Sequence, residues 1–262
     1  MNHAFTIPVY GRSPHLRACI DSILKQSQTG SAVVLTTSTP SVFLDNIAAE
    51  YRLPLVLNDV RDGIGSDWNF ALTAPDAQFV TVAHQDDFYN PDYIKLMFEA
   101  INRHPDALVA FSNNTEHTPD GARKVNINLC IKRALSARAF GSSEALDRLQ
   151  DKRRLLNLGN PVCCPSVIIN RRLLPDFRFT GAMKSNLDWE GWWRLAQLPG
   201  KFVYVKTPLV SKGVHPESET SALIANQLRE QEDRQMFDHF WPRPVAAAIA
   251  LVYKLGYRAN RV

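Results

Sequence analysis

Residues 80–91, VTVAHQDDFYNP, predict a buried strand that runs into two adjacent carboxylates and is followed at once by a helix. The segment Phe79–Ala83 is a short apolar, β-branched run of the kind that a central parallel strand needs. The pair Asn90-Pro91 is an N-cap followed by proline at the first helical position. The carboxylates are therefore expected at the carboxyl end of a strand, where open α/β sheets bind their ligands.

Two acidic side chains in succession repel each other, and a divalent cation is the usual reason to tolerate that repulsion. Mg²⁺ or Mn²⁺, binding one or two carboxylates together with substrate phosphate oxygens, fits the pair Asp86-Asp87. The alternative is a solvated acidic turn ahead of a helix, because acidic residues are common in turns. The pair alone favours the turn, and the rest of the chain favours the metal.

The first half of the chain alternates short apolar runs with segments of helical periodicity. Strands are expected at Ala4–Val9, Ala32–Thr36, Leu55–Leu57, Phe79–Ala83 and Leu108–Phe111. Helices are expected over residues 13–24, 40–51, 63–72 and 91–101. This order predicts an α/β fold in which a mostly parallel sheet is covered by helices on both faces.

The second half is less regular. Residues 115–125 are polar and rich in turn formers, and Gly159–Pro165 is expected to be a loop. Helices are predicted over residues 142–156, 186–198, 222–240 and 245–257, with strands at Ser166–Ile169 and Phe202–Val205. We therefore predict a main domain over residues 1–220 and a C-terminal helical extension over residues 221–262, packed on that domain or on a membrane surface.

Composition narrows the classes of function. The chain has 262 residues, 45% hydrophobic residues, 21% charged residues and a net charge of +4. That charge suits an anionic substrate or membrane surface and is too weak to predict nucleic-acid binding. The four cysteines have no metal-type spacing, which favours reduced thiols. Because no signal peptide and no stretch of about 20 apolar residues is apparent, we expect a cytoplasmic protein.

Two glycine-containing turns could approach a ligand. Residues 8–12, PVYGR, place a proline, a glycine and Arg12 after the first strand, where backbone N–H groups and the guanidinium could meet an anion. A plain strand-to-helix corner needs the same proline and glycine. Residues 62–69, DGIGSDWN, could bring backbone close to a nucleotide, but the third glycine of a dinucleotide motif is missing. A turn with Asp67 as helix cap is the simpler interpretation.

Asp188 lies between large side chains near the start of a predicted helix, in the stretch 187–194, LDWEGWWR. Partial burial against tryptophan raises the pKa of a carboxylate and helps it act as a general base. Tryptophan faces also stack on sugar rings. A capping acid beside core tryptophans is an equally simple interpretation. His215 is expected in a loop after the last strand, where it could be solvated, ligate a metal or bind phosphate.

Taken in order, these segments resemble the family-two glycosyltransferases of the GT-A fold. The matching stretches are Ile7–Arg12, Asp62–Gly65 with Trp68–Leu72, His84–Asp87 with Pro91, and Asp188–Glu190. The resemblance covers roughly residues 4 to 220. The form His-Gln-Asp-Asp of the metal motif resembles the form in the bacterial branch of the family, which builds surface polysaccharide of the O-antigen or capsule type. The resemblance implies a Rossmann-like, mostly parallel sheet flanked by helices.

The resemblance also implies an inverting transfer from a nucleoside-diphosphate sugar, with a UDP-sugar favoured, to a hydroxyl of a growing surface polysaccharide or lipid-linked oligosaccharide. Asp188 matches the general base, and Trp189 and Glu190 adjoin it as acceptor-binding candidates. The implied ligands of Mn²⁺ or Mg²⁺ are Asp86, Asp87 and His215. The implied donor-binding residues are Pro8, Tyr10, Arg12, Thr37, Gly65, Asn69, His84, Gln85 and Asp86.

The chain departs from the family at three positions. His84 replaces the first acid of the Asp-X-Asp motif, Thr37 lies where most relatives carry acids that contact the donor base, and Leu187 replaces the acid before the catalytic aspartate. Two other functions stay open: a sugar nucleotidyltransferase, and a non-catalytic nucleotide-sugar-binding protein. Residues 245–261 are apolar with two late arginines, and we expect them to lie on the inner membrane surface or to dock on the domain.

Overall fold

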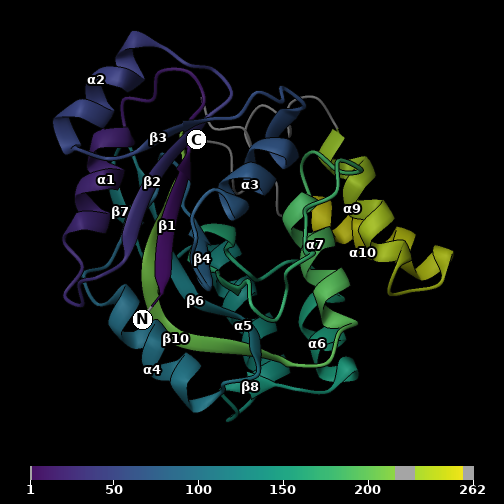
Figure 1. Ribbon diagram of the computed structural model, residues 1–262. Helices are drawn as coiled ribbons and strands as arrows, with labels where there is room; N and C mark the ends of the chain where they lie inside the picture. The colour runs from purple at the N-terminus through teal and green to yellow at the C-terminus, as the bar shows by residue number, and fades with distance from the viewer. Residues whose placement is uncertain (1, 216–227, 256–262) are drawn as a thin grey trace.

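The computed structural model describes residues 2–215 and 228–255 (Figure 1). These residues form a ten-stranded mixed sheet in the order β3-β2-β1-β4-β9-β6-β10-β5, with β7 paired to β6 and β8 paired to β10. Helices cover both faces of the sheet. The predicted α/β architecture is confirmed.

The N-terminal half is the parallel part of the sheet. Its strands are β1 (His3–Pro8), β2 (Ala32–Thr37), β3 (Leu55–Leu57) and β4 (Phe79–Val82). Its helices are α1 (Leu16–Leu24), α2 (Val42–Tyr51), α3 (Gly63–Thr73) and α4 (Tyr93–Arg103). Thr6 of β1 is in register with Val34 of β2 and Val82 of β4, so the carboxyl ends of these strands meet at one edge.

The C-terminal half adds antiparallel pairs. Strand β9 (Ile168–Asn170) lies between β4 and β6 (Ala107–Thr118), antiparallel to both. Strand β10 (Lys201–Gly213) runs parallel to β6 and carries β5 (Phe88–Tyr89) on its other side. The short strands β7 (Gly121–Arg123) and β8 (Ala145–Leu146) pair antiparallel with β6 and β10.

Two apolar cores lie on opposite faces of this sheet. One contains the buried side chains of α1, α2 and α4. The other is built by α3 and by five helices of the second half, namely α5 (Ile127–Phe140), α6 (Leu149–Leu156), α7 (Leu187–Ala196), α9 (Leu228–Asp238) and α10 (Arg243–Leu255). Phe237 of α9 and Ala246 of α10 are fully buried in this second core, so the C-terminal helices pack on the sheet domain.

The predicted helix over residues 142–156 is wrong in its first half, and α5 was not predicted. Helix α5 ends at Gly141, whose φ of 54° is unfavourable for other residues. Ala145 and Leu146 then pair with β10, and a helix forms only from Leu149. The missed helix had one start signal, because the Asn126 side chain accepts a hydrogen bond from the Leu129 amide.

Other boundaries also differ from the predictions. The polar stretch 115–125 is a hairpin of β6 and β7, in which Glu116 is paired with Arg123. Helices α1 and α4 begin at Leu16 and Tyr93, each two residues after the expected proline start. Strand β10 extends to Gly213, so His215 lies just beyond a strand end. Residues 221–227 and 256–262 of the predicted extension lie outside the described residues.

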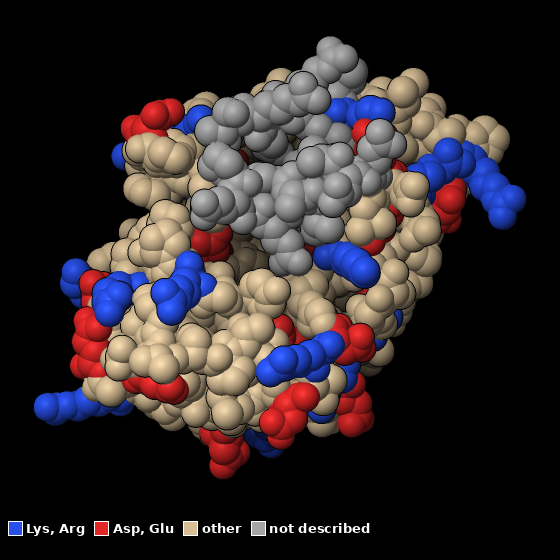
Figure 2. All heavy atoms as spheres, turned by 90° about the horizontal axis from the view of Figure 1, so that it is seen from above, with Lys and Arg blue, Asp and Glu red and all other residues tan. Residues whose placement is uncertain are grey.

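Within the described residues, none of the helices is long and apolar enough to span a bilayer. On the face shown in Figure 2, the described basic and acidic side chains are intermixed around the rim. This distribution agrees with the small net charge of the chain, and it gives no reason to expect a nucleic-acid surface there.

Candidate functional site

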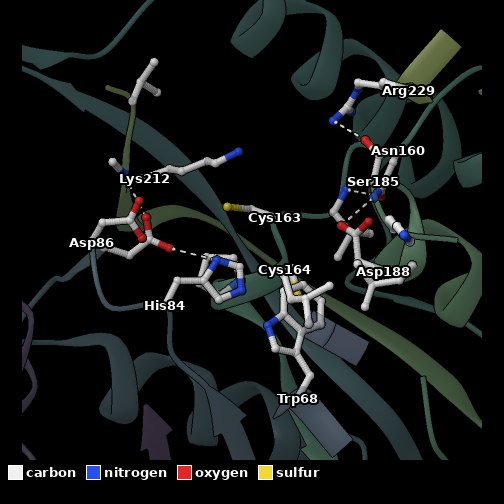
Figure 3. A pocket seen from close by; sticks show the side chains of 18 of the residues that line it. Trp68, His84, Asp86, Asn160, Cys163, Cys164, Ser185, Asp188, Lys212 and Arg229 are labelled. Carbon is white, nitrogen blue, oxygen red and sulfur yellow. Dashed lines mark hydrogen bonds and ion pairs between the residues drawn. The ribbon is translucent and has the colours of Figure 1, made fainter. Parts of the chain in front are cut away.

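A cavity of about 1490 Å³ lies beyond the carboxyl ends of the parallel strands. Both halves of the chain line it, and Figure 3 shows its two sides. His84 and Asp86 lie on one side, Asp188 and Asn160 lie on the other, and Cys163 lies between them. The structure therefore brings together the two acidic motifs that the sequence singled out, although they are about a hundred residues apart.

Asp87 joins the β4–β5 turn to the end of β10. Its carboxylate is buried, and Oδ1 accepts a hydrogen bond of 2.7 Å from the Gly213 amide. Burial, followed by the neighbouring Asp86 carboxylate, raises the pKa of Asp87 well above its ordinary value. Gly213 has no room for a side chain, because a Cβ there would overlap the Asp86 carbonyl oxygen and lie 3.2 Å from the Asp86 Cβ.

His84, Asp86 and Asp87 each present a possible ligand atom, and these atoms all lie within 4.8 Å of one another. Burial lowers the pKa of His84 to about 4, so its imidazole is neutral and its nitrogen is available to a cation. The His84 ring stacks on Trp68 with centroids 4.9 Å apart. Within the described residues, His84 Nε2 and Asp87 Oδ2 are buried without a hydrogen-bond partner.

Asp86 also faces a second imidazole. Its Oδ2 lies 3.0 Å from Nε2 of His215, just beyond the end of β10. Carboxylate oxygens and imidazole nitrogens are ligands that suit Mn²⁺, and carboxylates suit Mg²⁺. The buried atoms His84 Nε2 and Asp87 Oδ2, which have no hydrogen-bond partner among the described residues, and the carboxylate and imidazole ligands around them fit a divalent cation.

The mouth of the cavity is shaped by the turn after β1. The Gln85 side chain accepts a hydrogen bond from the Tyr10 amide and donates one to the Tyr10 carbonyl, both at 3.3 Å. Gly11 has a φ of 63° and donates to the Thr39 hydroxyl. This clamp leaves the Tyr10 ring 70% exposed beside Pro8 in the cavity wall, where a flat ligand group can stack on it.

Asp67 does not cap α3, as the sequence had suggested, because the helix begins four residues earlier at Gly63. Its carboxylate accepts hydrogen bonds from the Ser38 hydroxyl at 3.0 Å and from the Asn58 amide at 2.9 Å. Asp67 thus ties α3 to the segments that follow β2 and β3, and it lines the cavity.

Asp188 lies in the first turn of α7 and is partly buried. Its Oδ2 accepts a hydrogen bond of 2.9 Å from Asn160, and its Oδ1 accepts one of 2.8 Å from the Trp189 amide. Burial raises its pKa, while the Trp189 amide and three nearby cations oppose the rise. A carboxylate with a raised pKa in a cavity is suited to accept a proton.

A carboxylate from α9 holds the segment that precedes Asp188. Glu232 is buried and accepts hydrogen bonds from the backbone amides of Lys184, Ser185 and Asn186, at 2.8, 2.7 and 2.9 Å. Asp233 accepts a further bond of 2.7 Å from the Asn186 side chain. The start of α7 is therefore fixed by a helix some 45 residues later in the chain.

Four of the expected donor-binding residues do not line the cavity. Arg12 is exposed, and the buried Thr37 hydroxyl donates to the Val9 carbonyl at 2.7 Å. Gly65 is buried inside α3, facing the Thr180 carbonyl. Asn69 exchanges two hydrogen bonds with the Phe179 backbone, at 2.7 and 2.8 Å. The contacts of Thr37, Gly65 and Asn69 indicate structural roles.

The two acceptor-binding candidates beside Asp188 also face away from the cavity. Trp189 is fully buried, and its indole N–H donates to the Leu156 carbonyl. Glu190 accepts from the Thr180 hydroxyl and pairs with Arg194 at 2.8 Å. Because Asp188 is the outward residue of this helical turn, its two neighbours must point into the core.

The sequence analysis missed several residues that line the cavity near Asp188. They are Asn160, Lys132, Lys212 and Arg229, and the analysis also missed Glu232, which binds the backbone amides that precede Asp188. Asn160 precedes a proline in the expected loop, which was a weak signal. The cations come from separate elements that only the fold brings together, so no spacing in the sequence links them.

Comparison with known proteins agrees with these features. The profile described as Glycosyl transferase family 2 matches residues 5–174, more than half of the chain. Among solved structures, the chain is similar to S. aureus TarS 1-349 in complex with UDP-GlcNAc, with 18% identity and a TM-score of 0.64, over 95% of this chain and 70% of that one. It is also similar to the mannosyltransferase PcManGT from Pyrobaculum calidifontis in complex with GDP-Man and Mn2+, with 14% identity and a TM-score of 0.62, over 99% of this chain and 70% of that one.

A longer structure of S. aureus TarS matches with 18% identity and a TM-score of 0.64, and there the chain spans 43% of the other chain's length. At these identities the likeness shows a shared fold, and the predicted GT-A fold is confirmed. A comparison with curated proteins finds no match.

The close approach of β10 to Asp86 generates a first prediction. Gly213→Ala should lower the free energy of unfolding by about 1–3 kcal/mol, since the methyl group meets backbone atoms that cannot rotate away. The measurement is urea denaturation. Gly181→Ala is the matched control, because Gly181 is exposed and no neighbouring atom lies within 4 Å of the position that the added methyl group would take. Equal stability of the two variants would contradict the close approach.

Proposed function

The chain belongs to glycosyl transferase family 2, and on this premise we propose that it transfers a sugar from a nucleoside-diphosphate donor, a UDP-sugar in the favoured case, to an acceptor hydroxyl. One observation carries the proposal. A group of possible cation ligands around Asp86 and a partly buried carboxylate at Asp188 face each other across one cavity. A donor diphosphate on one side and an acceptor hydroxyl on the other would place the anomeric carbon between them.

The donor side would be built as follows. Tyr10 and Pro8 would stack on or flank the base, with Gln85 holding the Tyr10 backbone in place. Asp86 and His215 would hold Mn²⁺ or Mg²⁺, with His84 and Asp87 beside them. Such a cation, when bound, neutralises charge on a leaving diphosphate. Lys212, which extends from this side into the cavity, would add a positive charge close to the same leaving group.

The acceptor side would be built around Asp188. Its carboxylate would take the proton from the acceptor hydroxyl while that oxygen attacks the anomeric carbon from the face opposite the diphosphate. A single base in this position leads to inversion. Asn160 would hold the carboxylate in the orientation that points into the cavity, and Glu232 would fix the helix start that carries it.

The proposed biological setting is the cytoplasmic face of a membrane, where the acceptor would be a growing surface polysaccharide or a lipid-linked oligosaccharide. Helix α10 packs on the domain through Ala246, while Val245 and Leu251 are 42% and 69% exposed. This outer face would contact the membrane peripherally, and residues 221–262 would form an extension of the domain at 1–220.

A second prediction tests the donor site. A thermal-shift panel of UDP, GDP, dTDP and CMP with Mn²⁺ should stabilise the protein with one nucleoside diphosphate, by about 2.7 kcal/mol at a hundredfold excess over Kd. Asp86→Ala should lose the Mn²⁺-dependent part of the shift, and Asp59→Ala, an exposed acid, should keep it. If no nucleotide shifts the melting temperature of the wild type, the proposed transferase activity is wrong.

A third prediction concerns the base. Asp188→Asn should reduce kcat by about 10²- to 10⁴-fold, because the proton acceptor is lost, with nucleotide binding retained. Asp45→Asn, an exposed acid in the first turn of α2, is the control. A variant that turns over at the wild-type rate would exclude Asp188 as base.

The raised pKa of Asp188 sets the pH dependence. The carboxylate is active when ionised, so kcat/KM should fall on the acid side at a pH above the ordinary aspartate pKa. In Asn160→Ala the carboxylate loses a hydrogen-bond donor, which should move this acid limb to higher pH. An acid limb that is unmoved in Asn160→Ala would argue against the assignment.

A fourth prediction tests the membrane contact. Leu251→Gln with Val245→Gln should weaken co-sedimentation with anionic liposomes, because apolar area on the outer face of α10 is removed. Val60→Gln changes an exposed apolar residue elsewhere and should have no effect. Equal sedimentation of the wild type and both variants would contradict the proposed membrane contact.

A further inference from the structure

Three cations from separate elements converge on the cavity beside Asp188. Lys132 comes from α5, Lys212 from β10 and Arg229 from α9. Figure 3 shows Lys212 and Arg229 reaching toward the space in front of Asp188 from opposite directions. All three lie close enough to Asp188 to favour its ionised form.

The positive charges in this group are only partly compensated. Arg229 donates a hydrogen bond of 3.4 Å to the Ser185 hydroxyl, and its charge opposes the rise in the pKa of Asp233, one turn later on α9 and outside the cavity lining. Among the residues of 2–215 and 228–255, Lys132 has no hydrogen bond or ion pair, although it lies partly buried in the cavity wall. Burial and the charges of Lys212 and Arg229 lower the pKa of Lys132, so its charge is costly in the free protein.

Asp188 cannot balance three cations. It is one carboxylate, and its proposed role requires it to stay free to accept a proton. Asp86 and Asp87 lie on the other side of the cavity and would be engaged by the donor's cation. Three cations that line the cavity around one carboxylate are best explained by an anionic ligand that binds there.

Binding of the donor diphosphate would explain the position of only one of the three cations. Lys212 adjoins Gly213, the residue bonded to Asp87, so it belongs to the donor side. Arg229 is bonded to Ser185, within the segment that precedes Asp188, and so belongs to the acceptor side. The pKa of Lys132 is shifted by Lys212 as well as by Asp188 and Arg229, and neither Asp86 nor Asp87 is among the groups that shift it most.

We propose that the acceptor carries an oxyanion, a phosphate or a carboxylate, which Lys132 and Arg229 bind beside its reacting hydroxyl. This inference rests on the proposed transferase function and adds the chemical class of the acceptor. The guanidinium of Arg229 can bind two oxygens of such a group at once, while the Lys132 ammonium provides a point charge. A neutral sugar would offer neither cation an anionic partner in the cavity and should bind much more weakly.

The test uses the full chain, saturated with Mn²⁺ and the nucleoside diphosphate found in the thermal-shift panel, so that the donor site is filled. Glucose, glucose 6-phosphate and glucuronate are then titrated, and binding is measured by ligand-observed NMR. Glucose 6-phosphate or glucuronate should bind at least tenfold more tightly than glucose, and the better of the two identifies the anion as phosphate or carboxylate.

Substitutions test whether Lys132 and Arg229 bind the anionic group of the acceptor. Lys132→Met and Arg229→Gln should each remove most of this preference, while leaving the affinity for the nucleoside diphosphate within twofold of wild type. Lys95→Met changes an exposed lysine on α4 and should keep the preference. Melting temperatures monitor folding, and Lys132→Met should be no less stable than wild type, because it removes a desolvated charge that has no partner among the described residues.

Three results would overturn the inference. The first is equal binding of glucose and both anionic sugars to a protein that binds nucleotide with Mn²⁺, which leaves the transferase function intact. The second is a Lys132→Met variant that loses nucleotide affinity, since the lysine then serves the donor. The third is a wild type that binds no nucleotide, in which case the proposed function fails and the acceptor class fails with it.

Discussion

The hydrogen bond between the Gly213 amide and the Asp87 carboxylate is the junction on which the site depends. It fastens the end of the last long strand to the turn after β4, in the middle of the sheet. The same contact sets where Asp86, Lys212 and His215 lie, because all three are within two residues of the bonded pair. A buried carboxylate has a high desolvation cost, and here the cost is offset by a backbone donor that only a glycine can bring so close.

The two sides of the cavity are stabilised in different ways. On the Asp86 side, the functional groups project from strand ends, and the sheet's own hydrogen bonds fix them. On the Asp188 side, the residues before α7 form no sheet contact, and the Glu232 carboxylate satisfies three of their amides instead. Free amides at a helix start need such partners. The Asp188 side is thus held by side-chain hydrogen bonds rather than by strand pairing.

The parallel half of the fold could be predicted from the sequence, because each strand and helix there shows its own periodicity and its own turn residues. The second half could not, since β8 is two residues long, β9 is three, and β10 contains irregular pairing between Val205 and Val210. Asp86 and Asp188 stood out in the sequence because they follow a strand or begin a helix, and the structure places both in the cavity wall. Asn69 and Trp189 were assigned to binding, but their partners are Phe179 and Leu156, contacts that only the tertiary structure reveals.

The position of Glu232 has a consequence for how the chain matures during synthesis. The sheet, the Asp86 turn and α7 are all encoded before residue 220, so a nascent chain can assemble them first. The amides of Lys184, Ser185 and Asn186 nevertheless stay unsatisfied until α9 has left the ribosome and docked. The segment before α7 therefore depends on a helix encoded more than 40 residues later, and the Asp188 side of the cavity is completed only when that helix has docked.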